Sequence, residues 1–386
     1  MKHPKFEGPR ATRPGELPAL VRLLNGIFRP DGTTSIRDEH PYLYASPYRE
    51  GLRIMLDRGR LVSHYGVKVW TFELLGAPLN LASVGGVCTH PDYRGHGLAT
   101  KLLRDAEALC RRKGADLIWI SGDRGLYTSN GYGFAGRCRL FDLDAAFARR
   151  ARPAAGFRLR AVRPRGLPRL AALGADEPAR FRRPPEELAL LVAGRRGRAV
   201  PDPLLFVSRA GRDLAWLDLA TLDNRKTWRL WDYAGDREAV CAGLALAMRR
   251  ERVRRLTAAV PAWDAAFLAR LQDAGLRGKD GTIPWHTLKI PDFRRFMEKL
   301  RPALEERAGA RAVAGLRFER RGHGGGAIRA GRRALVLENS HDLVALVFGA
   351  PPRKLPAAVR RAPAPVARFI AAALPLPLRF PGLNYV

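Results

Sequence analysis

The chain has 386 residues, more than one hydrophobic core usually serves, so we expect two or three domains. Hydrophobic residues make up 46% of the sequence, but no apolar run approaches the roughly 20 residues of a membrane span. The net charge of +31 comes mostly from arginines spread from end to end, without the aromatic-interleaved basic stripe typical of RNA-binding proteins. We therefore expect a soluble cytoplasmic protein without a secretory signal, and nucleic-acid binding is disfavoured.

The cysteines are too few and too widely spaced to indicate a disulfide framework or a CxxC metal or redox pair. We expect structural thiols and no metal site. The four positions are Cys88, Cys110, Cys138 and Cys241.

The first part of the chain predicts alternating helices and strands. Apolar residues at helical spacing predict a helix over 15–28, and β-favouring runs over 61–76 and 79–90 predict adjacent antiparallel strands. A period of 3.6 predicts a helix from Leu98 with Gly114 as its left-handed cap, followed by a buried strand over 117–121. The fold class is therefore α/β, or α+β.

The stretch HPDYRGHGLATKLL, residues 90–103, lies between the second strand and this helix. Backbone N–H groups at a helix N-terminus have no partner within the helix, and the helix dipole favours an anion there. Gly95 and Gly97 would let the backbone approach a ligand without a Cβ in the way. A pyrophosphate fits such a loop, although neither a Walker loop nor a GxGxxG motif is present.

The longer string VCTHPDYRGHGLATKLL resembles the coenzyme A-binding motif of the GNAT superfamily of N-acetyltransferases, V-x-x-x-P-x-x-R-x-x-G-x-A. The resemblance implies a GNAT acetyltransferase fold in which acetyl-CoA is the co-substrate. The strand end would contact the pantetheine arm, and the amides of residues 95–100 would hold the pyrophosphate. The binding residues so implied are Val87, Cys88, Thr89, Arg94, Gly95, His96, Gly97, Leu98, Ala99 and Thr100.

The segment GDRGLYTSNGYGFAG, residues 122–136, follows the next strand and resembles the other wall of the GNAT cofactor cleft. The resemblance implies that Tyr127 protonates the departing thiolate and that Asn130 adds a cofactor contact; the alternative is a loop tyrosine packed on the sheet edge. Cys88 is interpreted as strand packing rather than as an acyl-carrying nucleophile, because no histidine is positioned by the sequence to activate it. We therefore expect direct transfer.

Acetyl transfer to an amine requires a base, and the sequence near the motif provides no clear candidate. Asp92, Asp105 and Glu107 are placed by pattern on the loop surface or the outer helix face.

The middle of the chain repeats the first pattern imperfectly. A Pro/Arg-rich stretch over 149–170 indicates a linker, and strands and helices alternate after it to about residue 285. No R-x-x-G-x-A loop precedes the first helix of this part. We interpret it as a degenerate second GNAT-like domain that does not bind the cofactor, against the alternative of an unrelated α/β module.

The last part changes pattern. It predicts a helix over 292–307, strands over 316–321, 326–331, 333–339 and 342–349, and a helix over 366–374. This order resembles a sterol carrier protein-like α+β domain, though an ordinary hydrophobic core would explain the same apolar residues. The expected domains are 1–150, 151–285 and 286–386.

The three segments in this order resemble the enhanced intracellular survival class of acetyltransferases. The class implies that the C-terminal carboxylate, here of Val386, acts as general base, and it implies a homo-oligomer, a hexamer in that class. The expected function is acetyl transfer from acetyl-CoA to a primary amine of a small molecule or peptide, such as an aminoglycoside, a polyamine or a lysyl side chain. The alternatives are a non-catalytic acyl-CoA-binding regulator and a basic nucleic-acid-associated protein.

Overall fold

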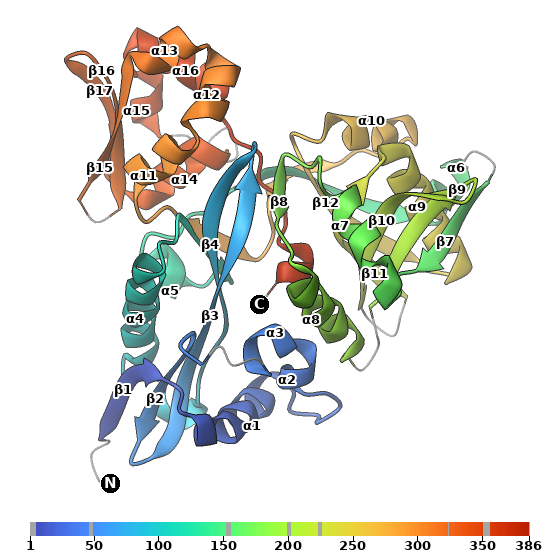
Figure 1. The fold of residues 1–386 in the computed structure, drawn as a ribbon, viewed down its shortest axis with the longest axis horizontal. Coiled ribbons are helices and arrows are strands. Elements are labelled where there is room, and N and C mark those ends of the chain that lie inside the picture. Colours follow the sequence, from blue (N-terminus) through green and yellow to red (C-terminus); the bar gives the residue numbers. More distant parts are fainter. Residues whose placement is uncertain are drawn as a thin grey trace.

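Two large sheets and one small sheet form the molecule (Figure 1), and the mixed α/β character predicted from the sequence is confirmed. Within the part of the chain that the structure covers, no helix combines the length and apolar character needed to cross a membrane. The computed structural model describes residues 5–45, 49–151, 156–198, 202–222, 226–322, 324–349 and 356–385.

The first sheet has the strand order β1-β2-β3-β4-β5-β14, with β8 paired to one end of β3. Neighbouring strands are antiparallel, except for the parallel pair β4–β5. The strands are β1 (Phe6–Ala11), β2 (Leu52–Asp57), β3 (Arg60–Leu74), β4 (Ala77–Thr89), β5 (Leu117–Ser121), β8 (Ala179–Phe181) and β14 (His286–Lys289).

Helices cover both faces of this sheet. The apolar face of α4 packs against β2, β3 and β4, and the fully buried Leu20 and Leu24 of α1 pack on the opposite side. The predicted helices and strands between residues 15 and 121 are confirmed, including the left-handed Gly114 at the end of α4. The elements are η1 (Pro14–Glu16), α1 (Leu17–Phe28), α2 (Ile36–Glu39), α3 (Pro41–Tyr44), η2 (Pro91–Tyr93), α4 (Leu98–Arg112) and α5 (Gly125–Thr128).

The second sheet has the order β13-β6-β12-β11-β10-β9-β7, and its only parallel pair among the described strands is β11–β12. Its central strands thus repeat the sequence of directions of the first sheet, with α9 placed as α4 is. The elements are β6 (Arg137–Asp144), α6 (Ala145–Arg150), β7 (Phe157–Ala161), η3 (Pro164–Gly166), α7 (Leu167–Leu173), α8 (Pro185–Arg196), β9 (Leu204–Arg209), β10 (Arg212–Leu222), β11 (Thr227–Gly235), α9 (Arg237–Arg250), β12 (Arg255–Pro261), α10 (Ala265–Asp273) and β13 (Lys279–Thr282).

The third unit is a three-stranded antiparallel sheet with helices packed against it. The final segment returns from this unit to the centre of the molecule, where η6 contacts α8 and β11 (Figure 1). The elements are α11 (Phe293–Lys299), α12 (Arg301–Ala308), α13 (Ala310–Ala314), β15 (Leu316–Arg321), β16 (Gly325–Ala330), β17 (Arg333–Leu337), α14 (Ser340–Phe348), α15 (Ala357–Arg360), α16 (Ala364–Ala373) and η6 (Gly382–Asn384).

Three predicted elements differ from the structure. The strand predicted over 342–349 is wrong: the segment is helix α14, whose N-cap Asn339 accepts a hydrogen bond from the Asp342 N–H. The helix predicted over 292–307 is two helices, because a new helix begins at Arg301 after Leu300, with Pro302 in its first turn. The linker predicted over 149–170 contains strand β7.

Strands cross the predicted domain divisions at 150 and 285. Strand β6, from the first predicted domain, pairs with β12 and β13 of the second sheet. Strand β14, from the third predicted domain, pairs with β5 of the first sheet. The units therefore exchange strands, while the assignment of each unit to a known domain type stays a prediction.

Candidate active site

Strands β4 and β5 separate at the centre of the first sheet. Their pairing runs from Leu81↔Leu117 to Val84↔Ile120, and β4 then continues to Thr89 without β5 as a neighbour. The pairing of β4 with β3 shifts at this point, so that Gly86 lies in a β-bulge with φ of +59°. The β4 backbone beyond Val84 therefore has no strand neighbour on the β5 side.

The predicted glycine loop follows this unpaired part of β4, at the N-terminus of α4. Gly95 and Gly97 have φ of +83° and +70°, and a Cβ at either position would meet open space. Within the described chain, none of the backbone N–H groups from Gly95 to Thr100 has a hydrogen-bond acceptor, and residues 94–97 are exposed. The loop therefore has the free donors and the space that an anion requires.

The other predicted cofactor residues surround this loop in different ways. The Arg94 side chain has no partner in the described structure, whereas the ring of His96 packs against Phe6 with centroids 5.6 Å apart. Thr89 is hydrogen-bonded through its hydroxyl to Ser63, at 2.8 Å. The remaining predicted positions, Val87, Leu98, Ala99 and Thr100, are buried or half-buried along β4 and the first turn of α4.

The Cys88 side chain is buried in the hydrophobic core. Burial raises the pKa of its thiol to about 12, so that the thiolate is scarcely populated at neutral pH. The chemistry of this side chain supports the interpretation of Cys88 as strand packing.

Tyr127 lies in α5 below the β5 end and is almost fully buried. A Cβ on Gly122 would lie 2.7 Å from its ring, so this glycine permits the ring position. Burial raises the Tyr127 pKa to about 12. The Asn130 side chain donates to the Leu126 carbonyl at 2.7 Å and so holds the same turn.

Two buried polar side chains at the bulge were not predicted from the sequence. The Nδ1 atom of His64 bonds the Gly86 carbonyl at 2.9 Å, while Nε2 and the Tyr44 hydroxyl have no partner in the described chain. Burial lowers the His64 pKa to about 4, which keeps the ring neutral at pH 7. The sequence signal that could have indicated them is the pair Gly66 and Gly86, because an added Cβ at these positions would approach His64 and Tyr44.

The three acidic residues considered as bases have different environments. Asp92 is exposed, as expected. Asp105 and Glu107 do not lie free on the outer face of the helix: Asp105 is paired with Arg53 at 2.5 Å and Glu107 with Lys289 at 2.8 Å. Both acidic groups on α4 are thus engaged in ion pairs that attach the helix to its neighbours.

The end of the chain reaches the same region. The backbone carbonyl of Tyr385 accepts a hydrogen bond from the Tyr42 hydroxyl, and its phenol interacts with Ser121 at the end of β5. Its ring contacts those of Trp231 and His286 at centroid distances of 5.1 and 5.5 Å. Val386, the predicted base, lies outside the described residues.

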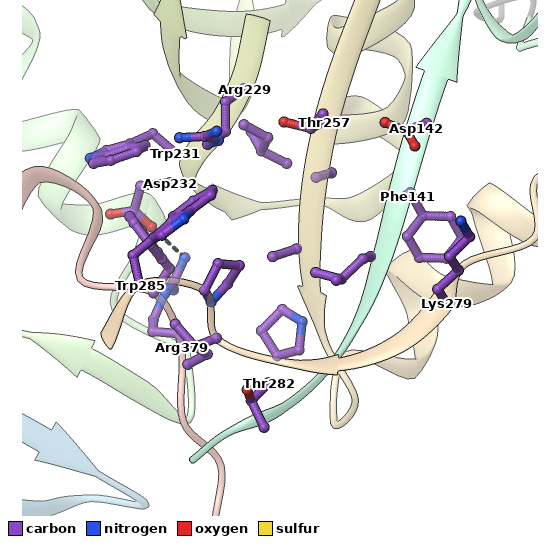
Figure 2. A pocket seen from close by; sticks show the side chains of 18 of the residues that line it. Phe141, Asp142, Arg229, Trp231, Asp232, Thr257, Lys279, Thr282, Trp285 and Arg379 are labelled. Atoms are coloured by element: carbon purple, nitrogen blue, oxygen red, sulfur yellow. Dashed lines mark hydrogen bonds and ion pairs between the residues drawn. The ribbon is translucent and has the colours of Figure 1, made fainter. Parts of the chain in front are cut away.

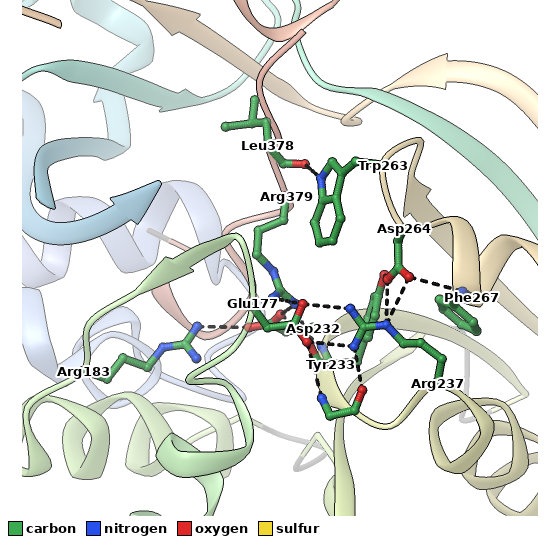
Figure 3. Close-up of polar contacts among 11 residues, drawn as sticks. Glu177, Arg183, Asp232, Tyr233, Arg237, Trp263, Asp264, Phe267, Leu378 and Arg379 are labelled. Atoms are coloured by element: carbon green, nitrogen blue, oxygen red, sulfur yellow. Dashed lines mark hydrogen bonds and ion pairs between the residues drawn. The ribbon is translucent and has the colours of Figure 1, made fainter. Parts of the chain in front are cut away.

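The second parallel pair carries no comparable cradle. The N-cap of α9 is Asp236, whose carboxylate accepts the Ala239 N–H at 2.7 Å and occupies the place that an anion would take. Beyond the last β11–β12 pair, Arg379 of the tail binds Asp232 at 2.6 Å (Figure 3). Trp263, after β12, donates to the Leu378 carbonyl at 2.8 Å. The tail therefore lies where the second sheet opens.

A family model matches the part of the chain that forms most of the first sheet. Residues 9–135 match the family model of the acetyltransferase (GNAT) domain. No curated protein sequence matches the chain.

Solved structures resemble this one over nearly its whole length at low sequence identity. A GCN5-related N-acetyltransferase from Anabaena variabilis has 13% identity and a TM-score of 0.64, with 99% of this chain and 100% of that chain covered. Eis1 from Mycobacterium abscessus has 15% identity and a TM-score of 0.61, covering 97% and 98%. A GCN5-related N-acetyltransferase from Kribbella flavida has 15% identity and a TM-score of 0.60, covering 99% of both chains. These likenesses show a shared fold.

Proposed function

Because residues 9–135 are a GNAT acetyltransferase domain, the chain is an acyltransferase, and we propose that it transfers acetyl from acetyl-CoA to a primary amine by direct attack. The observation that carries the proposal is the row of unpartnered N–H groups at the start of α4, beside the separated strands β4 and β5. Charge-assisted hydrogen bonds from such groups contribute roughly 1.5 to 3 kcal/mol each, enough together to hold a pyrophosphate.

Acetyl-CoA supplies an activated thioester, whose carbonyl carbon accepts the amine nitrogen and whose C–S bond then breaks. Tyr127 would donate its hydroxyl proton to the departing sulfur. Its pKa of about 12 keeps the phenol protonated at neutral pH, as a proton donor must be.

The amine must lose a proton, and we assign the base to the terminal carboxylate of Val386. The support is the position of its neighbour Tyr385, which is held by Tyr42 and Ser121 at the end of β5. His64 is neutral and has a free, buried nitrogen, so it is the alternative base.

The finer features of the chain belong to the same proposal. The second sheet, with its capped α9 and its tail-filled opening, would be a degenerate GNAT-like unit without a cofactor. The third unit would be sterol carrier protein-like, and the chain a cytoplasmic homo-oligomer. Aminoglycosides, polyamines and lysyl side chains all remain within the proposed substrate class.

The test is thiol release from acetyl-CoA across a panel of these amines. Tyr127→Phe, and separately a short glycine extension after Val386, should each slow transfer by roughly 10²- to 10⁴-fold without weakening cofactor binding. Ser129→Ala removes a hydroxyl from the same turn and should leave the rate unchanged.

Two other outcomes would reject parts of this proposal. Tight acetyl-CoA binding without turnover of any amine would favour a non-catalytic regulator. A wild-type rate in the extended chain would reject the terminal carboxylate and direct the search to His64.

A further inference from the structure

A pocket of about 620 Å³ lies on the second sheet, and none of its lining residues belongs to the α4 loop (Figure 2). Strands β6, β11 and β12 form its floor, and residues 282–285 form one wall. The volume lies within the range of roughly 300 to 1,000 Å³ typical of small-molecule sites. Nothing in the proposed acetyl transfer uses this pocket.

The walls of the pocket are largely apolar and aromatic. Trp231 and Trp285 lie on either side of Arg229, and the guanidinium is 4.0 Å from the Trp285 ring centroid (Figure 2). Trp285 is 45% exposed and has a φ of +56°, a conformation that bulky residues rarely adopt. A large side chain held in this way at a pocket rim is typical of a binding site rather than of a core.

The charges of the pocket are unbalanced. Two of its cations are already neutralised, since Arg255 is paired with Asp142 at 2.6 Å and Arg379 with Asp232 at 2.6 Å. Three others have no carboxylate partner in the described chain, whereas Asp123 is the only unpaired acid among the lining residues. The three cations are Arg229, Arg277 and Lys279.

Arg229 is the cation that a ligand would meet inside the pocket. Its burial lowers the guanidinium pKa, which is the effect of removing a charge from water without an opposite charge beside it. Thr257 is its partner in the β11–β12 register, and the Thr257 hydroxyl is buried without a hydrogen-bond partner in the described chain. An acid group at this point would satisfy both side chains.

We propose that this pocket binds an anionic amphiphile, a molecule with an apolar or aromatic body and one acid group held by Arg229 and Thr257. The body would lie between the two tryptophans. The site is built mainly on the second sheet, with Asp123 and Phe134 of the 122–136 segment also lining it, and the proposal does not depend on the proposed acetyl transfer.

The test uses two fluorescent probes that differ only in charge: 8-anilinonaphthalene-1-sulfonate and its neutral parent N-phenyl-1-naphthylamine. The full-length protein should bind one equivalent of the sulfonate, and saturating acetyl-CoA should not displace it. Arg229→Gln should weaken the sulfonate about tenfold and the neutral probe less than twofold, because a charged hydrogen bond is worth roughly 1.4 kcal/mol or more.

Further variants keep the result interpretable. Thr257→Val keeps the shape of the side chain and should weaken only the sulfonate, by a few-fold, whereas Trp285→Ala should weaken both probes. Arg250→Gln alters an exposed ion pair on α9 and should change neither. Dodecanoate should compete with the sulfonate more strongly than dodecanol does. Equal sulfonate affinity in Arg229→Gln, or displacement by acetyl-CoA, would overturn the proposal.

Discussion

Gly86 allows the Tyr44 hydroxyl to approach the backbone of β4 at the bulge. A Cβ added there would lie 2.0 Å from the Tyr44 oxygen, and the φ of +59° disfavours any side chain. The bulge and the positions of the Tyr44 hydroxyl and His64 therefore depend on Gly86 having no Cβ.

Gly86→Ala should lower the free energy of unfolding by roughly 2 to 4 kcal/mol, through overpacking and backbone strain together. Adding Tyr44→Phe removes the clashing oxygen and should restore about half of the loss. Gly76→Ala is the control for strain alone, because Gly76 also has positive φ but faces open space; it should cost roughly 1 kcal/mol. Urea unfolding measures all three, and no recovery in the double variant would contradict the clash.

Three buried histidines should make the stability depend on pH, and burial lowers the pKa of one of them, His40, to about 3. Burial lowers the pKa of His64 and of His286 to about 4, below the usual 6.5 of the unfolded chain. The unfolded state therefore binds more protons as the pH falls below about 6.5, and the stability contributed by the neutral rings is lost progressively toward pH 4. Each ring should account for about 2 kcal/mol between pH 7 and pH 5. Urea unfolding of His64→Gln at both pH values should show a correspondingly smaller difference; an unchanged difference would argue against a neutral buried ring.

At this scale the sequence predicts residues that belong to one continuous string. Gly97 and Tyr127 lie within local motifs, so their positions in the structure were foreseeable. His64 and Tyr44 lie 22 and 42 residues before Gly86 in the sequence and meet it only through the tertiary fold. No local pattern indicates such a meeting.

At the scale of elements, α4 and α9 occupy equivalent places in the two large sheets, but their N-termini differ in whether an anion could bind there. The start of α4 has free N–H groups and glycines, while the start of α9 is closed by Asp236. Helix α9 is also buried over most of its length, so it serves the core of the second unit. We therefore expect one acetyl-CoA site per chain.

Gly97→Glu should abolish acetyl-CoA binding while the far-ultraviolet circular dichroism stays near wild type, because a carboxylate would take the place of the pyrophosphate. Gly32→Glu is a matched control with positive φ and open space in another loop. Asp236→Ala should cost about 1 kcal/mol of stability and leave binding unchanged. Calorimetric titration decides: retained affinity in Gly97→Glu, or two equivalents bound by the wild type, would refute the cradle.

Elements with a clear periodicity were predictable, and those without one were not. The amphipathic α4 shows the helical spacing of a surface helix. Helix α14 is buried on nearly every face, so its continuous apolar run has the same pattern as a buried strand. Strand β7 was hidden by the proline and arginine residues around it.

At the scale of the whole molecule, a buried ion network attaches the tail to the second unit (Figure 3). Arg379 pairs with Asp232, and Asp232 also binds Arg183 at 3.0 Å. Arg379 lies 3.6 Å from a second carboxylate, Glu177, and Glu177 is paired with Arg237 at 2.7 Å. The groups are almost entirely removed from water, so each charge depends on its partners.

Arg379→Met should lower the free energy of unfolding by roughly 3 to 5 kcal/mol, since it leaves buried carboxylates short of a partner. Acetyl transfer should fall further than stability explains, because Tyr385 follows Arg379 into the active site, whereas acetyl-CoA affinity should be kept. Arg250→Met removes an exposed pair with Glu251 and should cost less than about 1 kcal/mol. A loss below 1 kcal/mol for Arg379→Met would show that the network is not holding the tail.

Each of the two large sheets includes a strand from another part of the chain: β6 completes the second sheet, and β14 completes the first. A fragment cut at residue 150 would carry β6 away from its own sheet and would lose β14, which covers the outer edge of β5 and the buried Trp119. An uncovered strand edge with an apolar surface is a template for aggregation. The molecule should therefore unfold in one cooperative transition. After limited proteolysis at its surface, the fragments should stay associated until denaturant is added.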